Sequence, residues 1–133
     1  MSSFSDYLEN ELLDHVFGAA AFTAPATLYA AAYTANPSDS GGGTEATGGS
    51  YARVSITNNA TNFPAASGGA KANGTDITWT TATASWGTIT AVALLDASSG
   101  GNQICWDALA TSKAVGDGDT LEIATGDFDI TLD

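Results

Sequence analysis

The sequence predicts a mainly β fold, a compact antiparallel β-sandwich of jelly-roll or immunoglobulin-like type with one N-terminal α-helix. The first observation is a series of about seven short apolar or alternating segments with turn residues between them. The second is the nearly all-apolar segment 89–95, whose two faces both need cover in a folded protein. The third is a helical period in residues 5–17. A chain of 133 residues suits a single domain, 1–133.

Residues 5–17 carry apolar side chains at a spacing of about four, which predicts an amphipathic helix. Ser5 can cap its first turn, and Gly18 is a natural stop. The helix needs a surface to pack on, either its own sandwich or a neighbouring subunit. We therefore predict that its apolar face is an interface. The candidate interface residues are Leu8, Leu12, Val16 and Phe17.

The following segments alternate between strands and long polar loops. Residues 27–33 predict a strand, although their alanine content leaves a helix open. Residues 51–57 alternate apolar and polar side chains and predict a half-buried strand. The segment 38–50 is rich in glycine and serine, so we expect an exposed, flexible loop, and 58–74 is a second long, polar, glycine-containing loop. Loops of this length are uncommon unless they bind something or mediate assembly.

Residues 83–109 are expected to form the centre of the sandwich. They hold two apolar strands, 89–95 and 104–109, joined by a glycine-rich loop. We expect Trp86 and Trp106 to face inward and anchor the core.

The remaining segments predict three further strands, 76–80, 120–124 and 127–133. The last of these has the cleanest alternation of apolar and polar residues in the chain. Residues 113–119 are expected to form a turn that ends in Asp-Gly-Asp.

The charge is strongly acidic, with fifteen acidic and three basic residues and a formal net charge of −12. This balance argues against nucleic acid and anionic membranes as partners, because both attract basic surfaces. The sequence has no apolar run of about 20 residues that predicts a membrane span. Its N-terminus lacks the pattern of a secretory signal, so we expect synthesis and assembly in the cytoplasm.

No group of side chains predicts catalysis. The only histidine, His15, lies in the predicted helix, far in sequence from the only cysteine, Cys105, which we expect to be buried and inert. The carboxylates fall at turns or on the solvent side of strands, and the glycine clusters lack the lysine of a phosphate-binding loop. We predict a protein that is not an enzyme and that carries no cofactor or metal.

Two binding alternatives stay open. The segment 117–119, with Glu122 nearby, offers oxygen ligands for calcium, although a β-turn accounts for the same residues. The tryptophans and tyrosines could line a sugar-binding face, although core packing is the simpler account.

Several segments resemble one family of small tailed-phage virion structural proteins. The similarity covers almost the whole chain, and its most specific parts are DYLEN, PATLY, GGSYAR, ASWGTIT and GDTL. Members are labelled as phage tail fibre proteins, and some resemble capsid decoration (cement) proteins. The resemblance implies a non-enzymatic structural protein located in the virion.

The main interpretation is a capsid decoration protein, a homotrimer that reinforces contacts between major capsid protein subunits. A chain of 133 residues has no room for a long fibre shaft, whereas a compact body with a helix and long loops suits a cement protein. The alternatives are a tail fibre or baseplate module that contacts the host surface, and a carbohydrate-binding module.

Overall fold

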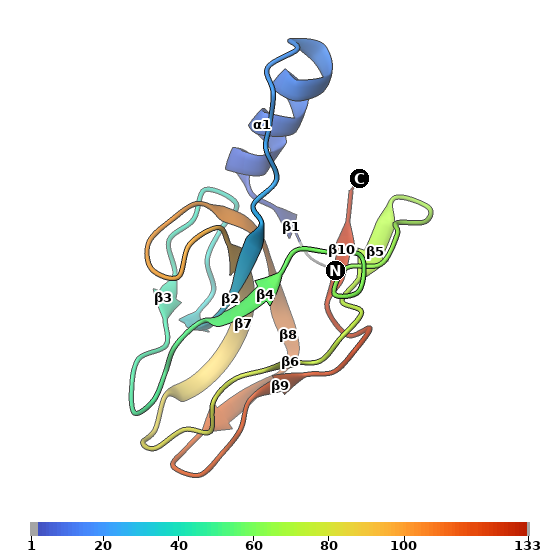
Figure 1. Cartoon of the computed structure of the whole chain (residues 1–133). Helices are drawn as coiled ribbons and strands as arrows, with labels where there is room; N and C mark the ends of the chain where they lie inside the picture. Colours follow the sequence, from blue (N-terminus) through green and yellow to red (C-terminus); the bar gives the residue numbers. More distant parts are fainter. Residues whose placement is uncertain (1–2, 133) are drawn as a thin grey trace.

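The computed structural model describes residues 3–132, which form a mainly β fold with one helix near the N-terminus (Figure 1). The paired strands are antiparallel. The expected mainly β, antiparallel fold with an N-terminal helix is therefore confirmed. The elements in chain order are β1 (Ser3–Phe4), α1 (Asp6–Phe17), β2 (Thr27–Ala35), β3 (Thr44–Glu45), β4 (Val54–Thr57), β5 (Ala70–Ala72), β6 (Ile77–Thr78), β7 (Gly87–Leu95), β8 (Gln103–Val115), β9 (Glu122–Ile123) and β10 (Asp129–Thr131).

One large sheet and two small ribbons make up the β-structure. The large sheet has the order β1-β8-β7-β2-β3, and β4 pairs with the first half of β2. The ribbons are the pairs β5–β10 and β6–β9, and their buried side chains share one hydrophobic cluster with the large sheet. Two short ribbons thus stand where a second full sheet was expected, and neither the jelly-roll nor the immunoglobulin-like sandwich type is confirmed.

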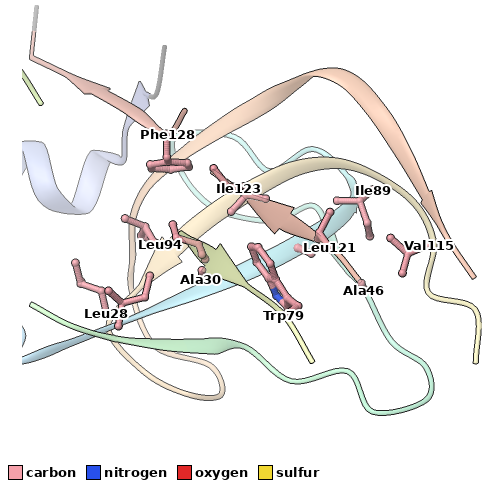
Figure 2. Packing of buried hydrophobic residues seen from close by; sticks show 14 of the residues in the cluster. Leu28, Ala30, Ala46, Trp79, Ile89, Leu94, Val115, Leu121, Ile123 and Phe128 are labelled. Carbon is pink, nitrogen blue, oxygen red and sulfur yellow. The ribbon is translucent and has the colours of Figure 1, made fainter. Parts of the chain in front are cut away.

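The main hydrophobic core joins the large sheet to the ribbons (Figure 2). Trp79 is 1% exposed and packs in one cluster with Ile89 and Leu94 of β7 and with Leu121 near β9. Trp86 also belongs to this core, and its indole N–H donates to a backbone carbonyl at 2.9 Å. The expectation that Trp86 anchors the core is therefore confirmed.

A second, smaller cluster covers the opposite face of the large sheet. It contains Ala91 and Ala93 of β7, and the half-buried Trp106 packs against it. Both faces of β7 are thus covered, as its all-apolar sequence predicts. The expectation that Trp106 joins Trp86 in one core is wrong, because neighbouring residues of a strand point to opposite faces and Cys105 occupies the main core.

Strand β8 is longer than predicted. It continues to Val115, where the sequence predicts a strand ending at residue 109 and a turn from residue 113. Gly87 of β7 pairs with Val115, and Ile89 pairs with Lys113, so backbone pairing extends the strand. Residues 110–114 of this extension are exposed, and its one large apolar residue is Val115, so the sequence lacks the alternation of apolar and polar side chains that predicts a strand.

The long loops contribute to the core more than expected. In the loop 38–50, Ala46 is 2% exposed and β3 pairs with β2. In the loop 58–74, Phe63 is 7% exposed and Asn73 is 3% exposed. Neither segment is exposed along its whole length, because single buried residues pack both segments against the body.

Candidate interaction surface: the N-terminal arm

A set of hydrogen bonds fixes the start of α1 on the large sheet. The amide of Ser5 donates to the carbonyl of Ile104 at 3.0 Å, and the Ser5 hydroxyl donates to the carbonyl of Gln103. The same hydroxyl oxygen accepts the amide of Leu8 at 3.2 Å, so Ser5 is the N-cap that the sequence predicts. The base of the helix is therefore held by β8.

Beyond this base, α1 projects away from the β-body, and the following segment returns alongside the helix (Figure 1). The amide of Phe22 in this returning segment donates to Nδ1 of His15 at 3.2 Å. His15 therefore links the helix to the chain that follows it. We call α1 together with residues 18–26 the arm.

The helix ends as predicted, but a different residue makes the reversal. Gly18 is the C-cap, and its amide donates to the carbonyl of Asp14 at 2.9 Å. Gly18 has a φ of −135°, whereas Ala19 has a φ of 54°, in the left-handed region. The sequence signal at Gly18 thus locates the end of the helix correctly, while the strained position lies one residue later.

The four predicted interface residues divide along the length of the helix. Leu8 is buried at 7% exposure and Leu12 is half-buried, so the first half of the apolar face covers the protein's own body. Val16 is 64% exposed and Phe17 is 83% exposed. These two side chains are free to meet a partner, and whether they do so stays a prediction.

Leu13 belongs to the same exposed surface, although it was not among the predicted interface residues. It is 57% exposed. It lies three residues before Val16 and four before Phe17, a spacing that places side chains on one side of a helix. We call Leu13, Val16 and Phe17 the apolar tip of the arm. The helical period was the signal that could have included Leu13.

The charged residues of α1 are all acidic. They are Asp6, Glu9, Glu11 and Asp14, and α1 has no lysine or arginine. Burial and the carboxylate of Glu11 raise the pKa of the Tyr7 phenol, a group that adds no charge near neutral pH even at its ordinary pKa. The apolar tip therefore lies at the end of a helix with negatively charged sides.

Other candidate sites from the sequence have structural roles. Cys105 is buried at 1% exposure in the main core. The carboxylate of Asp119 accepts the amide of Gly116 at 2.8 Å, within a turn in which Gly118 has a φ of 86°. Among residues 3–132, no three acidic, histidine or cysteine side chains converge as a metal-binding group. The described part of the chain also contains no helix long and apolar enough to cross a membrane.

Two of the three tryptophans are too deeply buried to form an open platform for a sugar. Trp79 is 1% exposed and Trp86 is 3% exposed. Trp106 is half-buried, and its indole N–H donates to the carboxylate of Asp39 at 3.1 Å. Stacking on a sugar ring needs an exposed aromatic face, which neither Trp79 nor Trp86 offers.

Comparison with known families gives one match that spans the fold. Residues 3–131 match the model of the family described as Podophage GP4 fiber I protein gp80. No curated protein matches the chain.

Proposed function

This chain belongs to the podophage GP4 fiber I protein gp80 family, and we propose that its arm attaches it to a neighbouring protein of the phage tail. Family membership makes it a phage tail fibre protein, a structural part of the virion with a non-enzymatic role. The resemblance found in the sequence is thereby confirmed at the level of the family. The family favours the tail fibre, expected as an alternative, and gives no support to the capsid decoration protein.

The observation that supports the proposal is the exposure of the apolar tip of the arm. The large apolar residues that stand exposed in the described part of the chain are Leu13, Val16, Phe17 and Leu132. Three of these four lie within five consecutive residues of α1. Clustered exposed apolar side chains mark interaction sites on proteins that are otherwise polar outside. Because the tip projects from the body, a partner can enclose it without displacing the β-structure.

The charge of α1 favours a partner of a different kind over a second copy of the same arm. Parallel packing of identical helices would bring Glu9, Glu11 and Asp14 close to their equivalents, with no lysine or arginine on α1 to pair with them. Like charges at such a helical interface are destabilising. The homotrimer predicted from the sequence would therefore use a surface other than α1.

Incorporation of variants into phage particles tests the proposal. We expect the double variant Val16→Ser, Phe17→Ser to fold normally, because both side chains are mostly exposed, and to be lost from assembled tails. Leu132→Ser is the matched control, since it removes an apolar side chain that is 62% exposed and lies outside the arm. Quantitative mass spectrometry of purified particles measures the copies retained. Normal incorporation of the double variant would exclude the arm as the attachment point.

A further inference from the structure

Two carboxylates of α1 lie beside the apolar tip of the arm. Glu9 is four residues before Leu13, and Asp14 is three residues before Phe17, and each spacing places the two side chains on one side of the helix. Both carboxylates are exposed. Neither forms a hydrogen bond or an ion pair with the described part of the chain. Their oxygens are therefore available to a partner that encloses the tip.

The helix dipole accounts for one of these two acids and not for the other. Glu9 is in the first turn, where the positive end of the dipole favours a negative charge. Asp14 is in the last turn, near the negative end of the dipole. It also lies three residues after Glu11, a spacing at which like charges repel. The charge of Asp14 thus opposes the stability of the helix that carries it.

The described part of the chain supplies no cation to offset this charge. Arg53 is paired with Glu45 at 2.8 Å, and neither Lys71 nor Lys113 forms an ion pair or a hydrogen bond with α1 in residues 3–132. His15 follows Asp14 directly, but its Nδ1 accepts the amide of Phe22, which is the role of a neutral ring. The charge beside the tip is therefore left for a different molecule to neutralise.

We propose that the apolar tip binds a groove of another tail protein that has an apolar floor and lysine or arginine residues along its rim. This inference rests on the proposed role of the arm as the attachment point. Leu13, Val16 and Phe17 have the spacing of the anchors by which an amphipathic helix fills an apolar groove. Their exposed fractions of 57%, 64% and 83% leave the apolar area that such a groove would cover.

The carboxylates give the groove its second property. A lysine or arginine of the partner beside Asp14 offsets both the repulsion from Glu11 and the negative end of the helix dipole. A second cation beside Glu9 fixes the direction in which the helix lies in the groove. Complementary charges at the edge of an interface select the partner and speed its association, while the apolar contacts supply most of the affinity.

Binding to phage tails assembled without this protein tests the proposal. Labelled full-length protein is titrated onto these tails, and cosedimentation gives the dissociation constant. We expect the double variant Glu9→Gln, Asp14→Asn to bind about fivefold more weakly than the native protein in about 50 mM NaCl, and equally in about 500 mM NaCl, where salt screens exposed charges. Asp117→Asn, Asp127→Asn is the matched control, because it removes two exposed carboxylates outside the arm and should bind normally.

Hydrogen exchange separates recognition from a structural role of Asp14. The amides of residues 18 and 20 donate to the carbonyl of Asp14 and report on the end of the helix. Because Asp14→Asn removes an unfavourable charge from this end, we expect these amides to exchange about twofold more slowly, although the variant binds more weakly. Faster exchange together with weaker binding would assign the loss to a damaged helix and would contradict the proposal.

The tip variant Val16→Ser, Phe17→Ser, measured in the same assay, reports on the arm itself. If it loses binding while Glu9→Gln, Asp14→Asn binds as the native protein does, the arm is the attachment point and the basic rim is excluded. If both variants bind normally, the arm and the rim are excluded together. Self-association of the free protein that the tip variant abolishes, measured by sedimentation, would make a second copy the occupant and would also overturn the proposal.

Discussion

The guanidinium of Arg53 and the carboxylate of Glu45 form two parallel hydrogen bonds, Nε to Oε1 and Nη2 to Oε2, each of 2.8 Å. The Arg53 side chain is 7% exposed, and the Glu45 side chain is 28% exposed. Nη1 of Arg53 also donates to the carbonyls of Ala97 and Gly100, at 2.7 and 2.9 Å. One side chain thus joins β3, the segment before β4 and the loop between β7 and β8.

We expect Arg53→Ala to lower the free energy of unfolding by about 3 kcal/mol, because it leaves Glu45 partly buried without its cation. Lys71→Ala is the control for charge, since Lys71 makes a single contact of 3.5 Å with the carbonyl of Phe63. Urea unfolding monitored by tryptophan fluorescence measures both variants. Similar losses for the two variants would show that the ion pair is not a special determinant of stability.

The same pair predicts a dependence of stability on acid pH. Burial raises the pKa of Glu45, but hydrogen bonds from Arg53 and Tyr51 outweigh burial and hold the pKa below its ordinary value. A carboxyl whose pKa is lower in the folded state stabilises the fold above its unfolded pKa, and this stabilisation is lost as the pH falls through the folded pKa. Urea unfolding from about pH 7 to about pH 3 should show this loss.

Glu45→Gln is the comparison that assigns the effect to this carboxyl. We expect the variant to be less stable than the native protein at neutral pH, with a smaller further loss on acidification, because the amide does not titrate. If the two proteins lose stability in parallel as the pH falls, other carboxyls account for the acid sensitivity.

Two tryptophans of the main core offer a matched test of hydrogen bonding. The indole N–H of Trp86 donates to the carbonyl of Gly49 at 2.9 Å, and the ring meets Tyr51 edge to face at 5.2 Å. The indole N–H of Trp79 is buried and has no hydrogen-bond partner among the described residues. Replacement by phenylalanine leaves a cavity at either position.

We therefore expect Trp86→Phe to destabilise the protein by about 1 kcal/mol more than Trp79→Phe, since only the first variant loses a hydrogen bond. Thermal and urea unfolding of the two variants under the same conditions measure the difference. A larger loss for Trp79→Phe would mean that packing around its ring outweighs the unpaired N–H.

Sequence reasoning works best here where side-chain periodicity and burial coincide. The helix 5–17 and the strand 89–95 are found because each places apolar residues at the spacing of its backbone. The far half of β8 is missed because backbone pairing with β7 defines it, while its side chains are largely exposed. The shift of register between β7 and β8, at Ile89 and Ala91, cannot be predicted from a single sequence.

The candidate interface residues of α1 show the same limit of prediction from sequence periodicity. The helical period identifies an apolar face, but it does not say which residues of that face the protein's own body covers. Leu8 and Val16 have the same chemistry in sequence, yet Leu8 is 7% exposed and Val16 is 64% exposed. The difference depends on where hydrogen bonds from Ser5 fix the helix on β8, and this is a long-range contact.

The end of α1 gives a prediction in which a substitution stabilises the protein. Ala19 has a φ of 54°, which costs a residue with a Cβ roughly 1–2 kcal/mol. Glycine removes this strain, but it also increases the conformational entropy of the unfolded chain, which lowers the free energy of unfolding by roughly 0.4–1 kcal/mol. We expect Ala19→Gly to stabilise the end of the helix by about 0.5–1 kcal/mol.

Hydrogen exchange is the suitable measurement, because the arm can open without unfolding the β-body. The amides of residue 18 and residue 20 both donate to the carbonyl of Asp14, at 2.9 and 3.1 Å, and report on the helix end. Their exchange should slow by about threefold in Ala19→Gly. Ala21→Gly is the control, since residue 21 is not among those with positive φ and the change adds only unfolded-state entropy. Faster exchange in Ala19→Gly would mean that packing of the Ala19 methyl group outweighs its backbone strain.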